Sequence, residues 1–161
     1  GYKLHALVDG CGAVEAWQTT PLNEGESTVA HTLLPQSPLR GVTLRTDGNY
    51  DSVALYQDVA KAGGRLISTR RKIGSGLGHH PQHPDRLHAI AQLEQAPQGR
   101  QAHERHRIRI EQTFGRLTTV SFGLWALPPS VRRLHRVRRW INAKIALYHV
   151  YLATRSAYHA A

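Results

Sequence analysis

The sequence predicts an α/β protein in which helices pack against a mixed sheet. Short runs of alternating or continuous apolar residues, typical of strands, occupy residues 2–8, 13–20, 42–46 and 65–69. Segments in which apolar residues recur every three or four positions, typical of helices, lie between and after these runs. Glycine and proline mark the boundaries between the two kinds of segment.

Composition places the chain among globular proteins. It has 161 residues, of which 40% are hydrophobic, enough for one domain with a buried core. Its single cysteine, Cys11, excludes an internal disulfide. No apolar run approaches the roughly 18 residues of a membrane span and no signal peptide is visible, so we expect a cytoplasmic protein without membrane partners. The chain has no methionine and opens directly on a strand-like run, which indicates a fragment.

The net charge of +10 is unevenly distributed along the chain. Residues 1–64 contain 4 Lys and Arg against 7 Asp and Glu, a net of −3. Residues 65–161 contain 17 against 4, a net of +13. A basic second part placed among structured segments indicates a polyanionic partner, and nucleic acid is the one we expect.

The first elements form a hairpin and a short helix. Residues 2–8 and 13–20 are predicted to be strands, joined by a turn with the sequence DGCG at residues 9–12. A short helix is expected at residues 27–34, closed by Pro35.

The central element is the stretch GVTLRTDGNYDS, which is residues 41–52. The strand at residues 42–46 runs directly into Asp47, and Gly48 and Asn49 then turn the chain. Asp47 therefore stands at the carboxyl end of a strand, where open sheets place their chemistry. Asp-Gly is also a common turn dipeptide, so a purely structural role for Asp47 remains open at this point.

A helix and a strand follow this turn. Asp51 and Ser52 are expected to cap a helix at residues 52–62, and Gly63-Gly64 ends it. Residues 65–69 form the next strand, so the predicted order is β-β-α-β-α-β.

The segment 70–100 is expected to be a basic, flexible insertion. It begins with a basic run, and residues 73–85 are rich in Gly, His and Pro, which favours an exposed mobile loop. Residues 86–95 are predicted to be a short helix, broken at Gln98-Gly99. Four histidines invite a metal-site interpretation, but no Cys or carboxylate completes a ligand set, so a polar loop is preferred. These histidines are His79, His80, His83 and His88.

A long helix is predicted at residues 101–120, with Ile110, Phe114 and Leu117 forming a buried stripe. Glu111 lies beside this stripe, which suggests the rim of a site for an anionic ligand. The alternative is an ordinary helical pair between Glu111 and the arginine four positions earlier. Four arginines surround the glutamate: Arg105, Arg107, Arg109 and Arg116.

An apolar loop at residues 121–125 and a last helix starting at Ser130 complete the chain. Apolar residues recur at every third or fourth position from Val131 to Leu152, and we interpret this stripe as core packing. Arginines beside it form either a solvated face or a phosphate-binding face, and the lack of Asp and Glu in this helix favours phosphate.

Three stretches of this sequence together resemble the catalytic core of bacterial insertion-sequence transposases of the DDE type. They are GYKLHALVDGCG (residues 1–12), RTDGNYDS (residues 45–52) and RHRIRIEQTFGRL (residues 105–117). The order of these motifs and the 64 positions from Asp47 to Glu111 carry the resemblance, which extends over nearly the whole chain. It implies a ribonuclease-H-like fold, here apparently lacking its first strand, and phosphoryl transfer on DNA.

The resemblance also implies a role for individual residues. In this family three carboxylates hold two divalent metals, Mg²⁺ or Mn²⁺. Asp47 matches the second carboxylate, Glu111 the third, and Arg107 an arginine that relatives carry one turn earlier. A tyrosine and a lysine common in the family are replaced here by Glu104 and Thr118, which leaves the subgroup open.

The first acidic residue of the family is expected on a strand before Gly1. Asp9 is the early candidate, but it falls in a hairpin turn and not beside the strand of Asp47. We therefore expect the chain alone to bind metal weakly and not to cut DNA, and to need an upstream segment of the same transposase. An exposed sheet edge at residues 1–8 would also favour pairing of two copies.

These inferences describe one truncated catalytic domain over residues 1–161, with a sheet part at 1–69, the insertion at 70–100 and a helical part at 101–161. Its expected partner is DNA at transposon ends, in the bacterial cytoplasm near the nucleoid. The alternatives are a nucleic-acid-binding protein without catalysis and a different nuclease of the same fold. The residues expected to contact DNA are Arg70, Arg71, Lys72, Arg105, Arg107, Arg109, Arg116, Arg132, Arg133 and Arg136.

Overall fold

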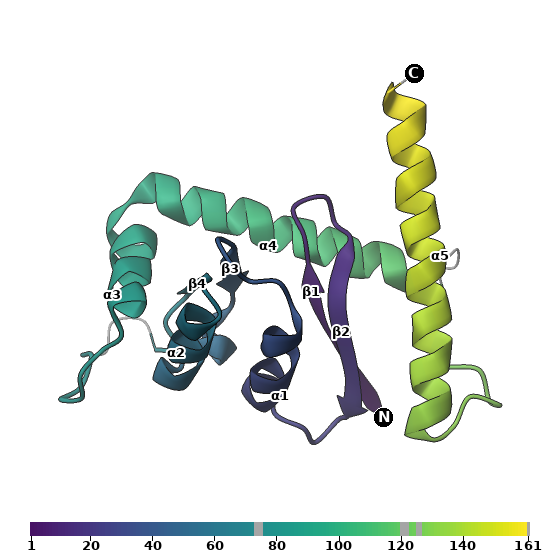
Figure 1. The fold of residues 1–161 in the computed structure, drawn as a ribbon, viewed down its shortest axis with the longest axis horizontal. Coiled ribbons are helices and arrows are strands. Elements are labelled where there is room, and N and C mark those ends of the chain that lie inside the picture. The colour runs from purple at the N-terminus through teal and green to yellow at the C-terminus, as the bar shows by residue number, and fades with distance from the viewer. Residues whose placement is uncertain (73–75, 120–122, 125–126, 161) are drawn as a thin grey trace. The chain divides into compact units, whose positions relative to one another are not determined.

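The computed structural model describes residues 1–72, 76–119, 123–124 and 127–160, with side chains described as far as residue 155. The chain forms two compact units, each with its own buried interior. Unit 1 comprises Gly1–Asn23 and Ile108–Ala161, and unit 2 comprises Glu24–Arg107. Figure 1 shows the course of the chain through its elements.

Unit 1 begins with an antiparallel hairpin. Strand β1 (Tyr2–Val8) pairs with β2 (Val14–Pro21), as predicted, with Tyr2 opposite Pro21. Asp9 closes the turn, because its Oδ1 accepts hydrogen bonds from the amides of Cys11 and Ala13, both at 2.8 Å. Asp9 is thus a turn residue, as its place in the sequence suggested.

The core of unit 1 lies between this hairpin and two helices, the end of α4 (Pro97–Thr118) and α5 (Leu134–Ala160). The apolar stripe along the last helix packs into this core, which confirms its interpretation as core packing. The buried residues are Val14, Leu117, Val137, Ile141, Ile145 and Tyr148.

Helix α5 begins at Leu134, so the prediction that it starts at Ser130 was wrong. The amide of Val131 donates to the carbonyl of Pro128 at 2.9 Å, which forms a turn before the helix. Arg133 then adopts a left-handed conformation with φ of 66°, which a right-handed helix cannot contain. Val131 nevertheless packs against the core from outside the helix.

Unit 2 contains the parallel strand pair. Strand β3 (Thr43–Thr46) pairs with β4 (Arg65–Ser68), and α2 (Val53–Lys61) connects them. Ser52 caps α2 through a 3.2 Å hydrogen bond from the Leu55 amide to its Oγ. Leu55, Val59 and Leu66 are fully buried between the helix and the strands.

One helix precedes β3, and the predicted order of elements is confirmed. Helix α1 (Glu26–Leu33) continues into a 3₁₀ turn at Leu34–Gln36 that contains Pro35. The described strands form two two-stranded sheets, one in each unit, where the sequence predicted a single mixed sheet. The α/β class is therefore confirmed by the order of helices and strands, whereas the single sheet is not observed.

Part of the segment 70–100 is helical. Helix α3 (Pro84–Ile90) continues into a π-helical turn at Ala91–Gln95, and α3 packs beside β4 (Figure 1). The expected break at Gln98-Gly99 was wrong, because α4 already begins at Pro97. A Cβ on Gly99 would lie 2.2 Å from the carbonyl oxygen of Gln92, so glycine allows the helix to pass this close to the π-helical turn.

Two predicted loops lie partly outside the described residues. In the predicted loop at residues 73–85, the described positions 76–83 contain no helix or strand. Of the predicted apolar loop at residues 121–125, only residues 123 and 124 are described. Within the described part of the chain, no helix is long and apolar enough to cross a membrane.

We expect Leu117→Ala to destabilise the protein by about 2–5 kcal/mol, because Leu117 is 0% exposed in the core of unit 1 and its truncation leaves a cavity. Urea unfolding followed by tryptophan fluorescence measures this, since Trp17 and Trp140 pack against the same core. Leu147→Ala is the matched control: Leu147 is 54% exposed, so the change should stay within about 0.5 kcal/mol. Equal effects of the two variants would contradict the core described above.

Candidate functional site

Asp47 lies directly after β3, in the strand–carboxylate–turn–helix arrangement that the sequence predicted. It begins a one-turn 3₁₀ helix at Gly48–Tyr50, and its Oδ1 accepts a 2.9 Å hydrogen bond from the Asn49 amide. Its own carbonyl oxygen accepts a 2.6 Å hydrogen bond from Ser68 Oγ, at the end of β4. The residue is exposed, so the carboxylate is accessible to a ligand from solvent.

A second carboxylate lies near Asp47. The Asn49 side chain donates to Glu26 Oε2 at 3.1 Å, and Glu26 belongs to the first turn of α1. Burial, together with the charges of Glu26 and Asp47, raises the pKa of Tyr50 to about 12. Glu26 carries no signal of this role in the sequence, because 20 residues separate it from Asp47.

Asp51 is not the helix cap that the sequence suggested. Its carboxylate accepts two hydrogen bonds from Arg86, from Nε at 2.7 Å and from Nη2 at 2.8 Å. It also accepts the Arg71 amide at 3.2 Å. Burial alone would raise the pKa of Asp51, but the hydrogen bonds from Arg86 and Arg71 and the charges of Arg86 and Arg70 outweigh it and lower this pKa.

Another bidentate pair joins the same region. Arg70 donates from Nε and Nη2 to the two carboxylate oxygens of Glu94, at 2.5 and 2.7 Å. The Arg70 side chain is only 11% exposed, so this member of the predicted DNA-binding set is engaged within unit 2. Arg71 and Lys72, its neighbours in the basic run, are exposed.

Arg45 in β3 is half-buried, and His103 in the first part of α4 is buried. Arg45 Nη1 and His103 Nδ1 are buried with no hydrogen-bond partner among the described residues. Burial, and next the charge of Arg45, lower the pKa of His103, so its imidazole is neutral at pH 7. The charge of Arg45, on the strand that leads to Asp47, thus acts on a buried neutral ring.

Glu111 lies on α4, exposed, in the part of that helix that belongs to unit 1. The hairpin turn anchors this part of the helix. Arg109 Nη1 donates to the carbonyl of Gly10 at 2.6 Å, and a Cβ on Gly12 would lie 3.1 Å from Thr113 Oγ1. Gly12 has φ of 92°, so glycine allows both the turn and this close approach.

The two predicted catalytic carboxylates belong to different units, Asp47 to unit 2 and Glu111 to unit 1. Their carboxylate oxygens are the ligand type that hard divalent cations prefer. Within either unit, the described residues contain no group of three or more His, Cys, Asp or Glu side chains that could hold a metal ion. Each unit thus contains one of the two predicted catalytic carboxylates.

The histidines of the basic segment do not form a metal site among the described residues. His83 has a structural role: its Nδ1 accepts the Asp85 amide at 3.2 Å and caps α3. Its ring stacks on Tyr56, with the ring centroids 6.0 Å apart.

Most of the remaining predicted DNA-binding arginines are exposed. Arg107 donates to Glu104, from Nη2 at 2.6 Å, which is an ion pair with both side chains about half exposed. Arg116 is half-buried. The exposed members are Arg105, Arg107, Arg109, Arg132, Arg133 and Arg136.

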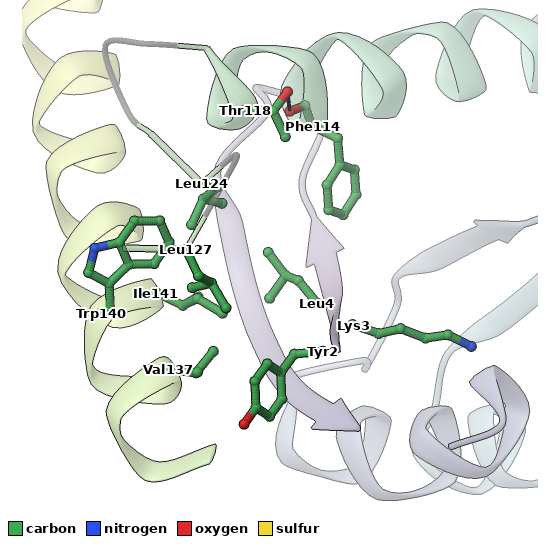
Figure 2. A pocket seen from close by; sticks show the side chains of 10 residues that line it. All are labelled: Tyr2, Lys3, Leu4, Phe114, Thr118, Leu124, Leu127, Val137, Trp140 and Ile141. Atoms are coloured by element: carbon green, nitrogen blue, oxygen red, sulfur yellow. Dashed lines mark hydrogen bonds between the residues drawn. The ribbon is translucent and has the colours of Figure 1, made fainter. Parts of the chain in front are cut away.

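Unit 1 contains an apolar pocket of about 270 Å³ (Figure 2). Phe114, Leu4 and Trp140 line it from α4, β1 and α5, while the amino group of Lys3 extends away from the apolar side chains. No predicted catalytic or DNA-binding residue lines this pocket, so it is not a candidate for the chemistry.

Residues 1–149 match the family model of the transposase DDE domain, and the chain therefore belongs to that family. The match includes both Asp47 and Glu111, and it confirms the resemblance to DDE-type transposases. Members of this family generally use divalent metal ions. No curated protein matches the chain, and no solved structure matches it.

The lowered pKa of Asp51 predicts an acid-sensitive contribution to stability. A carboxyl group with a lower pKa in the folded state stabilises the fold above its unfolded pKa of about 3.9, and this contribution is lost as the pH falls through the folded value. Asp51→Asn should therefore be less stable than the wild type at pH 7, and the difference should shrink below about pH 4. Urea midpoints measured by circular dichroism from pH 2.5 to 7 test this, and a difference independent of pH would contradict it.

Proposed function

We propose that this chain is part of the catalytic core of a bacterial insertion-sequence transposase that cuts and joins DNA strands by metal-dependent phosphoryl transfer. The observation that carries the proposal is the family match, which spans the carboxylate at the end of β3 and the carboxylate on α4. The proposal includes a ribonuclease-H-like arrangement of the strands. Asp47 and Glu111 are its metal ligands.

Asp47 suits this role in three respects. It stands at the carboxyl end of a parallel strand, its carboxylate is exposed, and its backbone is fixed by Ser68. When bound, two divalent cations such as Mg²⁺ or Mn²⁺ supply the positive charge that stabilises the attacking and leaving oxygens. Asp9 is engaged in its own turn, so only two of the three carboxylates that this chemistry uses are assigned in the chain, Asp47 and Glu111. We therefore expect weak metal binding and no DNA cleavage by the chain alone.

DNA binding is supported by the charge of unit 1. This unit contains 10 Lys and Arg against 3 Asp and Glu, so its own carboxylates can neutralise few of its cations. Unit 2 contains 11 against 8. Exposed arginines at the start of α5, with Arg136 in its first turn, suit contacts with backbone phosphates.

We expect Mn²⁺ to bind at Asp47 and Glu111. In the complex with duplex DNA, Mn²⁺ should broaden the amide NMR signals of Gly48 and Glu111, because a paramagnetic ion relaxes nearby protons. Asp47→Asn should abolish the broadening at Gly48, and Glu111→Gln the broadening at its own position. Neither variant should weaken DNA binding more than about twofold, because the phosphate contacts come from basic residues.

Two results would each contradict one part of the proposed metal chemistry. Unchanged amide signals with Mn²⁺, together with DNA binding by all variants, would replace the transposase proposal with a nucleic-acid-binding protein without catalysis. Plasmid nicking by the chain alone that Asp47→Ala abolishes would overturn the expectation that two carboxylates are insufficient.

We expect Arg136→Gln to weaken DNA binding at all sequences and to reduce the salt slope, d log Kobs/d log [salt], by about 0.9 in magnitude, as for one lost phosphate contact. Fluorescence anisotropy with a labelled duplex from 50 to 300 mM NaCl measures this slope. Lys61→Gln removes the same charge from an exposed position in α2, in the less basic unit, and should leave the slope unchanged. Equal slopes for the two variants would show a general charge effect instead of a defined contact.

A further inference from the structure

The ion pair between Asp51 and Arg86 has no part in the chemistry proposed above, although it is the most buried of the described ion pairs. Its side chains are 3% and 15% exposed, respectively. We propose that Asp51 and Arg86 are positioning residues that hold the Asp47 turn, defined as residues 47–51, in one conformation against the end of β4. This inference rests on the proposed role of Asp47 as a metal ligand.

The geometry of the pair fixes the Asp51 carboxylate. The two oxygens of Asp51 receive Nε and Nη2 of Arg86 at 2.7 and 2.8 Å, a bidentate arrangement that fixes both position and orientation. Nη1 of the same guanidinium donates to Gln82 Oε1. Arg86 lies in α3, which packs beside β4, so the pair connects the turn to a separate helix.

A single turn of backbone links Asp51 to Asp47. The two residues flank the single 3₁₀ turn, whose hydrogen bonds run from the Tyr50 amide to the Asp47 carbonyl at 3.2 Å and from the Asp51 amide to the Gly48 carbonyl at 3.3 Å. No flexible linker separates them. A displacement of Asp51 therefore changes the turn that determines where the Asp47 carboxylate points.

The opposite face of the turn lies against the chain that follows β4. A Cβ on Gly48 would lie 3.1 Å from the Arg70 carbonyl oxygen and 3.2 Å from the Arg71 Cα, so the turn lies directly on the chain that leaves β4. The Arg71 amide donates to Asp51, and Ser68 Oγ donates to the Asp47 carbonyl. The end of β4 and the segment after it thus hold both ends of the turn, through Ser68 at Asp47 and through the Arg71 amide at Asp51. Arg86 in turn holds the Asp51 carboxylate.

A positioning role explains why charged residues occupy this buried place. Apolar residues of similar volume often stabilise a fold as well as a buried ion pair does, because two charges must be removed from water. An ion pair with two parallel hydrogen bonds differs in being directional. That property matters for a turn whose exposed carboxylate must meet a metal ion in defined geometry.

Hydrogen exchange on the whole 161-residue chain tests the proposal directly. Arg86→Gln should increase exchange of the Tyr50 and Asp51 amides at least tenfold, at a temperature where the variant is folded, while the amides of β1 and β2 keep their protection. Arg65→Gln is the matched control, since Arg65 is 55% exposed and lies 3.8 Å from Asp85 of the same helix. It should change neither set of amides. Unchanged exchange at Tyr50 and Asp51 in folded Arg86→Gln would overturn the proposal.

Mn²⁺ binding supplies the functional readout. Arg86→Gln should weaken the Mn²⁺ affinity measured from broadening of the Gly48 amide about fivefold or more, and Arg65→Gln should leave it unchanged. If the wild type shows no broadening that depends on Asp47, the metal-ligand role fails, and hydrogen exchange alone then decides whether the pair holds the turn.

Arg86→Lys is a second variant that tests the proposal if Arg86→Gln does not fold. It keeps the charge but loses the two parallel hydrogen bonds. A folded Arg86→Lys protein with a loosened turn and weaker Mn²⁺ binding would support a role for the bidentate geometry. Exchange at the wild-type rate in Arg86→Lys would overturn that role. Unfolding of both Arg86 variants would also overturn it, because the pair would then be required for stability alone.

Discussion

The parallel pairing of β3 with β4 is the constraint on which the rest of unit 2 depends. Parallel strands bring their carboxyl ends to the same edge, so Asp47 and the chain after Ser68 emerge side by side. This proximity allows Ser68 to bond the Asp47 backbone and the Arg71 amide to bond Asp51. An antiparallel pair in the same place would separate these two chain ends, and the turn would lose its support.

The elements that could be predicted from the sequence are those specified by local patterns. The strands flanking the DGCG turn and the strand leading to Asp47 alternate clearly, and the turn residues between elements are strong signals. The start of α5 could not be predicted, because Ser130 is a good helix cap and nothing in the sequence shows that Arg133 adopts a positive φ. The propensity of Ser130 favours a helix start there, but the turn at residues 128–131 and the left-handed conformation of Arg133 delay the helix to Leu134.

In the candidate site, too, local features could be predicted from the sequence and contacts between distant residues could not. The setting of Asp47 was predicted, because a strand, a carboxylate and a tight turn are consecutive in the chain. Its support was not predicted, since Arg86 lies 35 residues from Asp51 and Glu26 lies 23 residues from Asn49. Contacts between residues so far apart depend on how α1 and α3 pack, which a single sequence does not state. Arg70 is a further example: the sequence shows its charge, but it does not show that Glu94 accepts its hydrogen bonds.

The close contact at Gly99 has an evolutionary consequence. Glycine inside a helix costs about 0.5–1 kcal/mol relative to alanine, so drift would tend to replace it where nothing opposes the change. Here even the smallest side chain would collide with the Gln92 carbonyl, which is backbone and cannot be mutated away. Relatives that retain this packing of the π-helical turn on α4 should therefore keep glycine at this position, and a larger residue there would identify lineages in which the two segments have rearranged.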